Sequence, residues 1–511
     1  MSEAAASVSQ RAGPGAAAAE SSRRWWILGV VGLAQLMVVL DATIVNIALP
    51  SAQRALVFSN ADRQWVVTAY SLAFGGLLLL GGRLSDLVGR RRMLIIGLIG
   101  FASASAFGGA ATGFAMLVIG RGAQGAFGAM LAPAALSTLT TTFTDPAERG
   151  KAFGVYGAIA GAGGAVGLLL GGLLTEYLSW RWCLYVNVIL AVLAVAGAAR
   201  LLERHPRDPA VHIDWPGTAL VAGGLVAVVY GLSEAETEGW GAPITDVLLP
   251  AGVVLLAAFA LVERRVQHPL LPLRIVASRF RGGAYLAIGL SSIGIFGIFL
   301  FLTYYLQLTL GYSPVTTGLA FLPMVAAIMV TSTTSSGVLM PRLGPRPLVP
   351  VGLLAAAGGM VVLATQLGLH TSYPAQILPA LLLTGAGMGL VFGCAMNTAT
   401  YGAGRADAGV ASAMVNTNQQ VGGSIGTALL NTIAASALTS YLVAHGHGPL
   451  VLAEAPVHSY VVAFWVSAAI LVAAAVVCAL VLASGTLAPA GPAAAAIPAA
   501  VPADPAATPA A

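Results

Sequence analysis

Long apolar segments separated by short polar stretches run through almost the whole chain. Fourteen of them are long enough to cross a bilayer, since about 20 apolar residues rising 1.5 Å each cover its hydrocarbon core. These runs are too long for barrel strands, and backbone polar groups in lipid must be bonded within the segment, so we predict α-helices. The approximate bounds are 25–49, 62–82, 93–112, 115–140, 151–176, 181–202, 214–233, 246–264, 284–309, 314–340, 347–366, 376–401, 406–435 and 458–484.

Composition agrees with this pattern. The 511 residues are 58% hydrophobic and only 8% charged, whereas soluble proteins carry about 25% charged residues. The net charge is +5, and the basic residues are scattered over short loops. A nucleic-acid-binding face is therefore not expected. Three cysteines, Cys183, Cys394 and Cys478, lie in separate apolar runs without CxxC spacing. Neither a disulfide framework nor a metal site is therefore indicated.

The arginines predict the orientation of these helices. If the N-terminus is inside, the cytoplasmic loops hold Arg90, Arg91 and Arg92 and most of the other basic residues. The opposite loops hold few basic residues and are richer in acids such as Glu234 and Glu454. This bias follows the positive-inside rule. With an even number of helices, we expect a multi-pass protein of the bacterial plasma membrane with both termini in the cytoplasm.

An internal repeat divides the chain. We expect an all-α polytopic membrane protein with six-helix bundles at 25–202 and 266–484 and two inserted helices within 203–265. Residues 1–24 are predicted to form a disordered cytoplasmic tail, and 485–511 a disordered Ala/Pro tail. Transporters built from such repeats bind substrate between the halves near the bilayer midplane. The repeat consists of Gly82, Leu84 and Gly89, echoed by Gly337, Leu339 and Gly344, and of Gly163, Gly164 and Gly167, echoed by Gly422, Gly423 and Gly426.

One carboxylate, Asp41, interrupts the first apolar segment. A charge at bilayer depth costs roughly 2.5–3.5 kcal/mol on insertion scales, so Asp41 must face protein or a watery cavity. It could be an acid wetted at the outer end of the helix, but we favour an ion- or substrate-binding carboxylate. Arg121 has no acid within its own segment, and a buried arginine needs a carboxylate or carbonyls. Asp41 is a plausible partner; a structural arginine held by backbone carbonyls is the alternative.

The loop after the second segment reads GGRLSDLVGRRRML and is a candidate cytoplasmic gate. Gly82 and Gly89 allow a tight turn and close approach of helices. Asp86 precedes Arg90 by four residues, a spacing that brings opposite charges together on a helical turn, and Arg91 follows. Asp86 could instead meet a neighbouring helix N-terminus. An ordinary basic loop that only sets topology is the alternative to a gate.

Small and polar residues inside other apolar segments suggest packing surfaces and a cavity. Glycines at spacings of three and four let helix backbones approach closely. They are not a dinucleotide-binding loop, because they lie within an apolar span without a preceding strand. The packing candidates are Gly157, Gly161, Gly164, Gly167 and Gly171. The candidates for a substrate cavity, some of which could instead bond between helices, are Gln124, Tyr304, Tyr305, Asn416 and Gln420.

Four motifs in order resemble those of a known family. GRLSDLVGRR resembles the signature loop between helices 2 and 3 of the major facilitator superfamily. LDATIVNIALP resembles the helix-1 motif of its 14-helix drug:proton antiporters, and LVIGRGAQG resembles the helix-4 motif of the superfamily. GVYGAIAGAGGAVGLLLGGLLTEYLSWRW resembles the antiporter motif of helix 5 with its downstream WRW. Together these motifs cover most of residues 25–200.

The resemblance implies a proton-driven antiporter that exports drugs, antibiotics or amphiphilic natural products by alternating access. Asp41 would carry the proton and Arg121 would tune it. The expected partners are protons, a small amphiphilic substrate and the bilayer, with a monomeric protein and no cofactor beyond the proton gradient. Leu168 stands where the family usually has proline, which keeps open a proton-coupled importer or symporter of a small metabolite. The sequence has neither an HExxH pattern nor a Walker loop, so we expect no enzyme activity.

Overall fold

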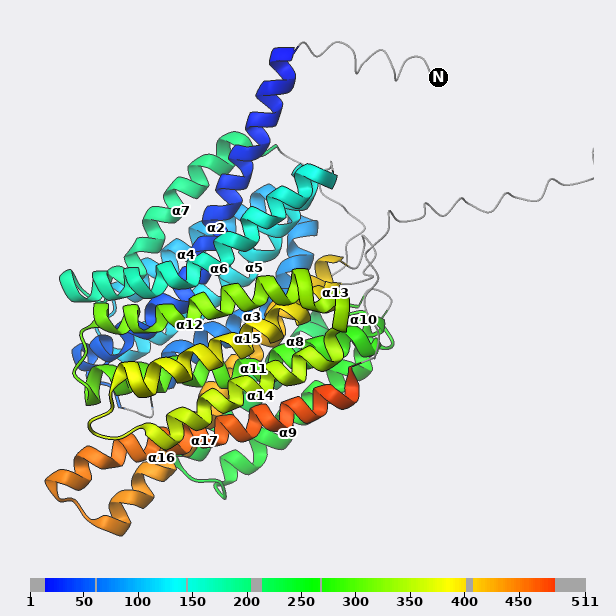
Figure 1. The fold of residues 1–511 in the computed structure, drawn as a ribbon. Helices are drawn as coiled ribbons and strands as arrows, with labels where there is room; N and C mark the ends of the chain where they lie inside the picture. The colour runs from blue at the N-terminus through cyan, green and yellow to red at the C-terminus, as the bar shows by residue number, and fades with distance from the viewer. Residues whose placement is uncertain are drawn as a thin grey trace, which may run out of the picture.

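The computed structural model describes residues 14–59, 62–143, 146–203, 214–266, 269–400 and 408–482. Within these ranges the chain forms long helices and no β-strand (Figure 1). Thirteen helices of the described part are long and apolar enough to cross a membrane. Together with α6 (Pro146–Tyr177), which is only partly described, they coincide with the fourteen segments of the sequence. The prediction of an all-α polytopic membrane protein is confirmed. The predicted C-terminal tail, 485–511, lies outside the described residues.

The helices of the first half pack around one another. Contacts join α2 to α6 and α7, and join α5 to α3 and α4. The first helix begins at Pro14 rather than near residue 25, so the prediction of a disordered tail over 1–24 is wrong for its last part. A run of alanines follows Gly15, and alanine has the highest helix propensity of any residue type, which explains the extension. The bounds are α2 (Pro14–Leu56), α3 (Arg63–Val88), α4 (Arg90–Gly109), α5 (Phe114–Thr142), α6 (Pro146–Tyr177) and α7 (Trp182–Leu201).

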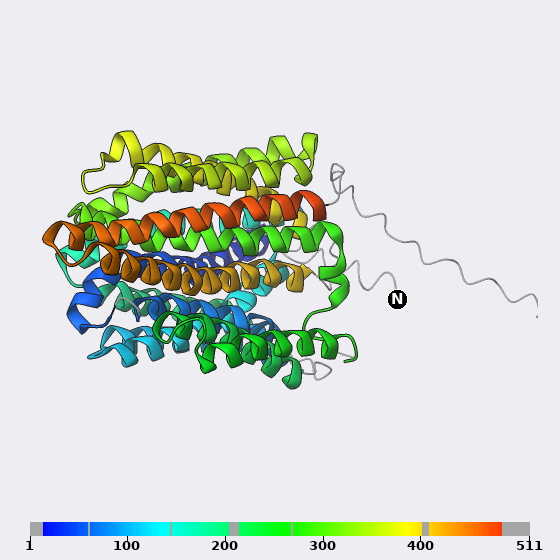
Figure 2. The same cartoon turned by 90° about the horizontal axis from the view of Figure 1, so that it is seen from below.

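The second half repeats this arrangement, with short π-helical segments at three helix ends. The last two helices extend beyond the predicted spans 406–435 and 458–484 and form the projecting hairpin seen in orange (Figures 1 and 2). The elements are α10 (Leu273–Ala277), α11 (Arg279–Tyr304), η1 (Tyr305–Thr309), α12 (Pro314–Thr334), η2 (Ser335–Leu339), α13 (Met340–Leu343), α14 (Pro345–Gln366), η3 (Tyr373–Ile377), α15 (Leu378–Thr400), α16 (Ala408–His445) and α17 (Pro449–Val481).

Two helices between the halves, α8 (Trp215–Thr237) and α9 (Pro243–Glu263), pack against each other. Helix α8 also packs against α3 of the first half and α16 of the second. Leu225 and Val229 of α8 are buried with Leu72 of α3 and Ala428 of α16. The hydroxyl of Thr432 donates to the carbonyl of Leu232 at 2.9 Å. The inserted pair is therefore part of the protein core on one side rather than a loosely attached hairpin.

The repeat seen in the sequence has the same geometry in both halves. Gly89 has φ 95° between α3 and α4, and Gly344 has φ 72° between α13 and α14. A glycine tolerates this left-handed backbone without steric cost. In α6, Gly167 and Gly171 lie against α2, and in α16, Gly422 lies against α11. In each half, the fifth helix therefore meets the first through glycine.

The glycine contacts of α6 lead to a stability prediction. A Cβ added at Gly171 would lie 2.9 Å from the carbonyl oxygen of Ile44, whereas one added at Gly164 would meet nothing within 4 Å. We expect Gly171→Val to be less stable than Gly164→Val by roughly 1–3 kcal/mol, the usual cost of overpacking. Thermal unfolding in detergent measures the difference, and equal melting temperatures would show that α2 and α6 do not need close approach here.

Candidate functional site

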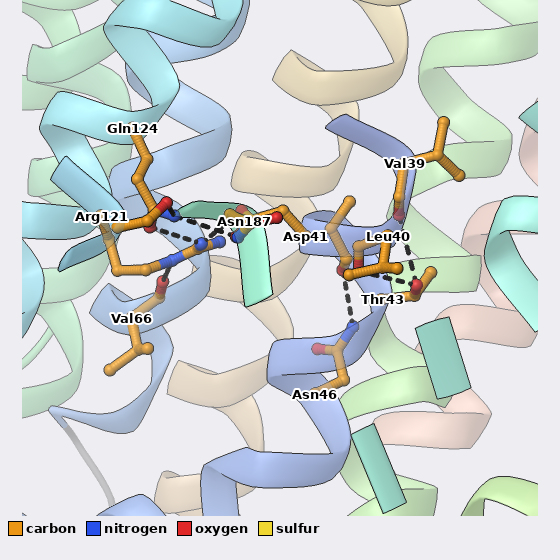
Figure 3. Close-up of polar contacts among 11 residues, drawn as sticks. Val39, Leu40, Asp41, Thr43, Asn46, Val66, Arg121, Gln124 and Asn187 are labelled. Atoms are coloured by element: carbon orange, nitrogen blue, oxygen red, sulfur yellow. Dashed lines mark hydrogen bonds and ion pairs between the residues drawn. The ribbon is translucent and has the colours of Figure 1, made fainter. Parts of the chain in front are cut away.

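A cluster of polar side chains surrounds Asp41 in the middle of the first half (Figure 3). Asp41 on α2 is completely buried. Arg121 Nη1 donates to its Oδ2 at 2.5 Å, while Gln124 Nε2 and Asn187 Nδ2 donate to its Oδ1 at 3.0 and 2.8 Å. An ionised carboxylate is an acceptor only. Three donors from α5 and α7 thus hold Asp41 in an arrangement suited to its charged form.

Arg121 is held both by a carboxylate and by a backbone carbonyl, the two kinds of partner that the sequence left open. Besides its ion pair with Asp41, it donates from Nε to the carbonyl of Val66 at 2.9 Å and from Nη1 to Gln124 Oε1 at 2.9 Å. Its Cζ atom lies 4.4 Å from the centre of the Tyr70 ring. Charge, hydrogen bonds and a cation–π contact together offset the cost of burying the guanidinium.

The helices bring these groups together because small residues permit close approach. Arg121 and Gln124 are three residues apart, so they share one face of α5. Gly120 lies directly against Gly108 of α4, and Gly125 lies against Ala73 of α3. Such close packing leaves little room for water, so the buried polar groups depend on partners within the protein. Gln124 Nε2 also donates to Ser105 Oγ of α4 at 2.6 Å.

Two buried polar atoms of this cluster have no hydrogen-bond partner in the described part of the chain: the Tyr70 hydroxyl and Asn187 Oδ1. An unsatisfied buried group costs about 1–3 kcal/mol. Both groups could therefore gain in a second arrangement, and both lie beside a carboxylate. The side chains of the cluster are therefore suited to two alternative arrangements of hydrogen bonds around Asp41.

Sequence reasoning identified Asp41 and Arg121, and the structure places them in contact. It predicted Gln124 as a residue of the substrate cavity, and the structure places this fully buried side chain in the Asp41 cluster. It missed Asn187, Ser105 and Tyr70. Asn187 had a signal, because it is an amide within the otherwise apolar stretch VNVILAVLAV, and such amides usually bond between helices.

The candidate gate residues are described only in part. Gly89 forms the turn between α3 and α4, and Arg91 Nη2 donates to the carbonyl of Ala199 at 2.7 Å. Arg90 is the first residue of α4. The side chain of Asp86 lies outside the described residues, so its pairing with Arg90 stays a prediction. Arg83 of the same motif donates to the carbonyl of Pro269 at 2.6 Å and thereby contacts the segment that leads into the second half.

Among the glycines predicted to allow close helix approach, the structure separates two kinds. A Cβ at Gly82 would make only an ordinary contact with Pro133 at 3.9 Å, whereas one at the neighbouring Gly81 would overlap the backbone of Ala129. Close approach therefore requires Gly81. A Cβ at Gly164 would meet nothing within 4 Å, so this glycine is not required for close approach either. The surroundings of Gly157 and Gly161 lie outside the described residues.

The other cavity candidates do not gather in one place. The Tyr305 hydroxyl donates to the carbonyl of Gly368 at 2.6 Å, within the second half. Gln420 lies against Gly75 of α3, and Asn416 is half-buried on the same helix. Tyr304 donates to Gln53 Oε1 at 2.5 Å, where the two halves meet. The structure thus brings Tyr304 and Gln420 to the junction between halves and turns Tyr305 away from it.

Hydrogen bonds join the two halves at the end of the helices opposite the GRLSDLVGRR loop. Gln307 Nε2 donates to the carbonyl of Ile47 at 3.1 Å, and the amide of Val315 donates to Glu176 Oε2 at 3.0 Å. The Tyr304–Gln53 bond lies at the same end. The two halves are therefore closed against each other on the side away from that loop.

Two similar helical halves, the first of which holds a buried charged cluster, have the architecture of a transporter built from repeats. The chain belongs to the Major Facilitator Superfamily, whose sequence pattern matches residues 31–427. It is 55% identical over 467 residues to the puromycin resistance protein pur8 of Streptomyces alboniger, covering 91% of this chain and 92% of that one. It is 39% identical over 406 residues to the cephamycin export protein CmcT of Amycolatopsis lactamdurans, covering 79% and 83%. The chain is thus a multi-pass membrane transporter.

Solved structures show the same fold at low sequence identity. A bacterial homologue of the human lysosomal transporter Spinster, in an inward-facing and unoccupied conformation, matches with a TM-score of 0.63 and 16% identity, covering 90% of this chain and 97% of that one. The sequence Gly422–Gly426 reads GxSxG, the pattern that surrounds the nucleophilic serine of many hydrolases. Ser424 lies within α16 and donates to the carbonyl of Gln420 at 2.9 Å, so it is a helical residue and not the exposed nucleophile of a hydrolase.

Proposed function

We propose that the protein is a proton-driven antiporter that exports an antibiotic, a drug or an amphiphilic natural product. The observation that carries the proton coupling is the ion pair of Asp41 and Arg121 within a fully buried cluster. The names of relatives at 55% and 39% identity, a puromycin resistance protein and a cephamycin export protein, support the direction of transport. The protein would act as a monomer, without a cofactor, in the bacterial plasma membrane with both termini in the cytoplasm.

The geometry around Asp41 supports a simple proton-linked switch. When Asp41 is ionised, its two oxygens accept from Arg121, Gln124 and Asn187. A proton on Oδ1 would turn that oxygen into a donor facing two N–H donors, and at least one of them must move. Asn187 can respond by turning its amide, because its own Oδ1 has no partner among the described residues and would then accept the proton. Protonation thereby loosens the hold of α5 and α7 on α2.

Alternating access would connect this switch to the substrate. The described state is closed on the side that the arginine distribution assigns to the exterior, as the Gln307–Ile47 and Tyr304–Gln53 bonds show. An ionised Asp41 in this state corresponds to a carrier that has released its proton inwards and can take up substrate. The membrane potential contributes roughly 2.3 kcal/mol per charge per 100 mV. Asp86, Arg90 and Arg91 would control the opposite, cytoplasmic side.

Purified protein in liposomes tests this proposal, with puromycin as the first substrate because of the similarity to the puromycin resistance protein. For an antiporter, an acidic vesicle lumen should drive puromycin inwards, and a protonophore should abolish the uptake. Uptake driven only by an acidic exterior would identify a symporter and overturn the proposal of export. Uptake indifferent to any gradient would remove the proton coupling.

A further inference from the structure

A buried arginine that the proposed function does not use lies where the two halves meet, on the same helix as Val66 and Tyr70 of the Asp41 cluster. Arg63 is the first residue of α3 and is only 5% exposed. Its Nε donates to Asn431 Oδ1 of α16 at 3.1 Å. Its Cζ lies 4.5 Å from the centre of the Tyr304 ring and 5.6 Å from that of Phe301. A residue of the first half is thus inserted among aromatic and amide groups of the second.

Among the described residues, the charge of Arg63 has no carboxylate partner. Each ion pair of the described residues involves a different arginine: Arg23, Arg24 or Arg121. Aromatic faces and an amide oxygen offset part of the cost of a buried guanidinium, but a buried charge normally requires an opposite charge. An arginine fork matches a carboxylate or phosphate better than any neutral group.

A cavity of about 320 Å³ opens beside this guanidinium. This volume is at the lower end of the range for small-molecule sites, roughly 300–1,000 Å³. Its walls are mainly aliphatic, with Leu308, Leu369, Ala434 and Leu438 among them. Its polar lining residues besides Arg63 are Asn431, Tyr460, Thr309 and Ser459, and of these Asn431 accepts from Arg63. The cavity thus combines one cationic group with a mainly apolar lining, which is the complement of an amphiphile with an anionic head.

We propose that this cavity binds a small amphiphile with a single anionic head, a carboxylate or phosphate on an apolar body, which pairs with Arg63. All the other residues lining the cavity belong to the second half, on η1, α16 and α17 and in the segment after α14. The site is therefore complete only while the halves are closed on this side. By linkage, an anion that binds this arrangement stabilises the closed state and opposes opening to the exterior.

Binding can be measured on the full-length protein in phosphatidylcholine nanodiscs with decanoate as the probe. We expect saturable binding of decanoate and at least tenfold weaker binding of decanol. Arg63→Gln should weaken decanoate binding at least tenfold, while Arg54→Gln, which removes an exposed arginine on the same side, should leave it unchanged. Wild-type affinity in Arg63→Gln, or equal affinity for decanol, would overturn the proposal.

A second variant tests the cavity without removing the charge. Ala435 lines the cavity on α16, and Ala435→Phe should fill the space and weaken decanoate binding at least tenfold even if Arg63→Gln fails to fold. Undiminished binding in a folded Ala435→Phe protein would place decanoate elsewhere and overturn the site. Nanodiscs with phosphatidylglycerol identify the natural source of the head group. Arg63-dependent competition by this lipid indicates a membrane lipid, and its absence indicates a free anion.

The proposed stabilisation of the closed state by the bound anion can be measured separately, from the distance between the two halves. Spin labels at Val57 of the first half and Leu450 of the second, both exposed, report the separation of the two halves on this side. The three native cysteines are buried, which favours labelling at the introduced positions. Decanoate should increase the population at the short distance in the otherwise native protein and not in Arg63→Gln. A shift towards the long distance, or none, would contradict the proposed linkage.

Discussion

Replacing Asp41 with asparagine is expected to reduce the gradient-driven uptake of puromycin proposed above to the level of protein-free liposomes. An asparagine has nearly the same shape but cannot bind and release a proton, so the switch proposed for the Asp41 cluster would lose its proton-binding carboxylate. Exchange of substrate across the membrane without net proton movement should persist, because it needs the substrate path and not the carboxylate. Measuring uptake and exchange on the same vesicles separates lost coupling from lost folding.

The matched control for Asp41→Asn is Asp246→Asn, which neutralises an exposed acid at the start of α9. It should transport like the native protein. Gradient-driven uptake at the native level in Asp41→Asn would remove Asp41 from proton coupling. The family assignment would stand, but the proposed role of the cluster would not.

Truncating Arg121 is expected to have the largest effect on stability. Removing one member of a buried ion pair leaves an uncompensated charge and typically costs about 3–5 kcal/mol. Arg121→Ala would also leave Gln124 and the carbonyl of Val66 without one of their partners. We therefore expect a marked fall in the melting temperature in detergent, while Arg200→Ala, at an exposed position of α7, should change it little.

The double variant Asp41→Asn with Arg121→Gln distinguishes charge from shape. If the cost arises from the unpaired carboxylate, the double variant should be more stable than Arg121→Gln alone, since neither charge remains buried. Equal stability of the two proteins would mean that the arginine acts through packing against Tyr70 and not through its charge.

The helices and the repeat were predictable because lipid imposes a strict rule on any chain that crosses it. Every apolar run of sufficient length became a helix, and Gly89 and Gly344 mark equivalent turns because only a left-handed backbone fits there. Asp41 and Arg121 were predictable as partners because each alone would be a buried charge without compensation. In each case the alternative, an unbonded backbone group in lipid or an unpaired buried charge, would cost several kcal/mol, so few structures remain possible.

Other features depend on smaller energies or on contacts that the sequence does not reveal. The projecting ends of α16 and α17 continue past the bilayer length, where water tolerates a helix as well as a loop. Gln124 and Tyr305 are polar within apolar spans, and the sequence does not show which helix each side chain faces. Arg63 stands at the very start of the predicted segment 62–82, where an arginine exposed to water would be ordinary. Its burial becomes visible only when the second half is placed against it.

The position of α8 makes the two flanks of the transporter unequal. On one flank, α8 covers the line where α3 meets α16, with Leu225 and Val229 packed into it. On the other, α6 meets α12 directly, through the close approach of Gly172 to Pro314, and among the described helices neither α8 nor α9 packs there. Because α8 covers the first flank, we expect a lipophilic compound that enters sideways from the lipid to use the second.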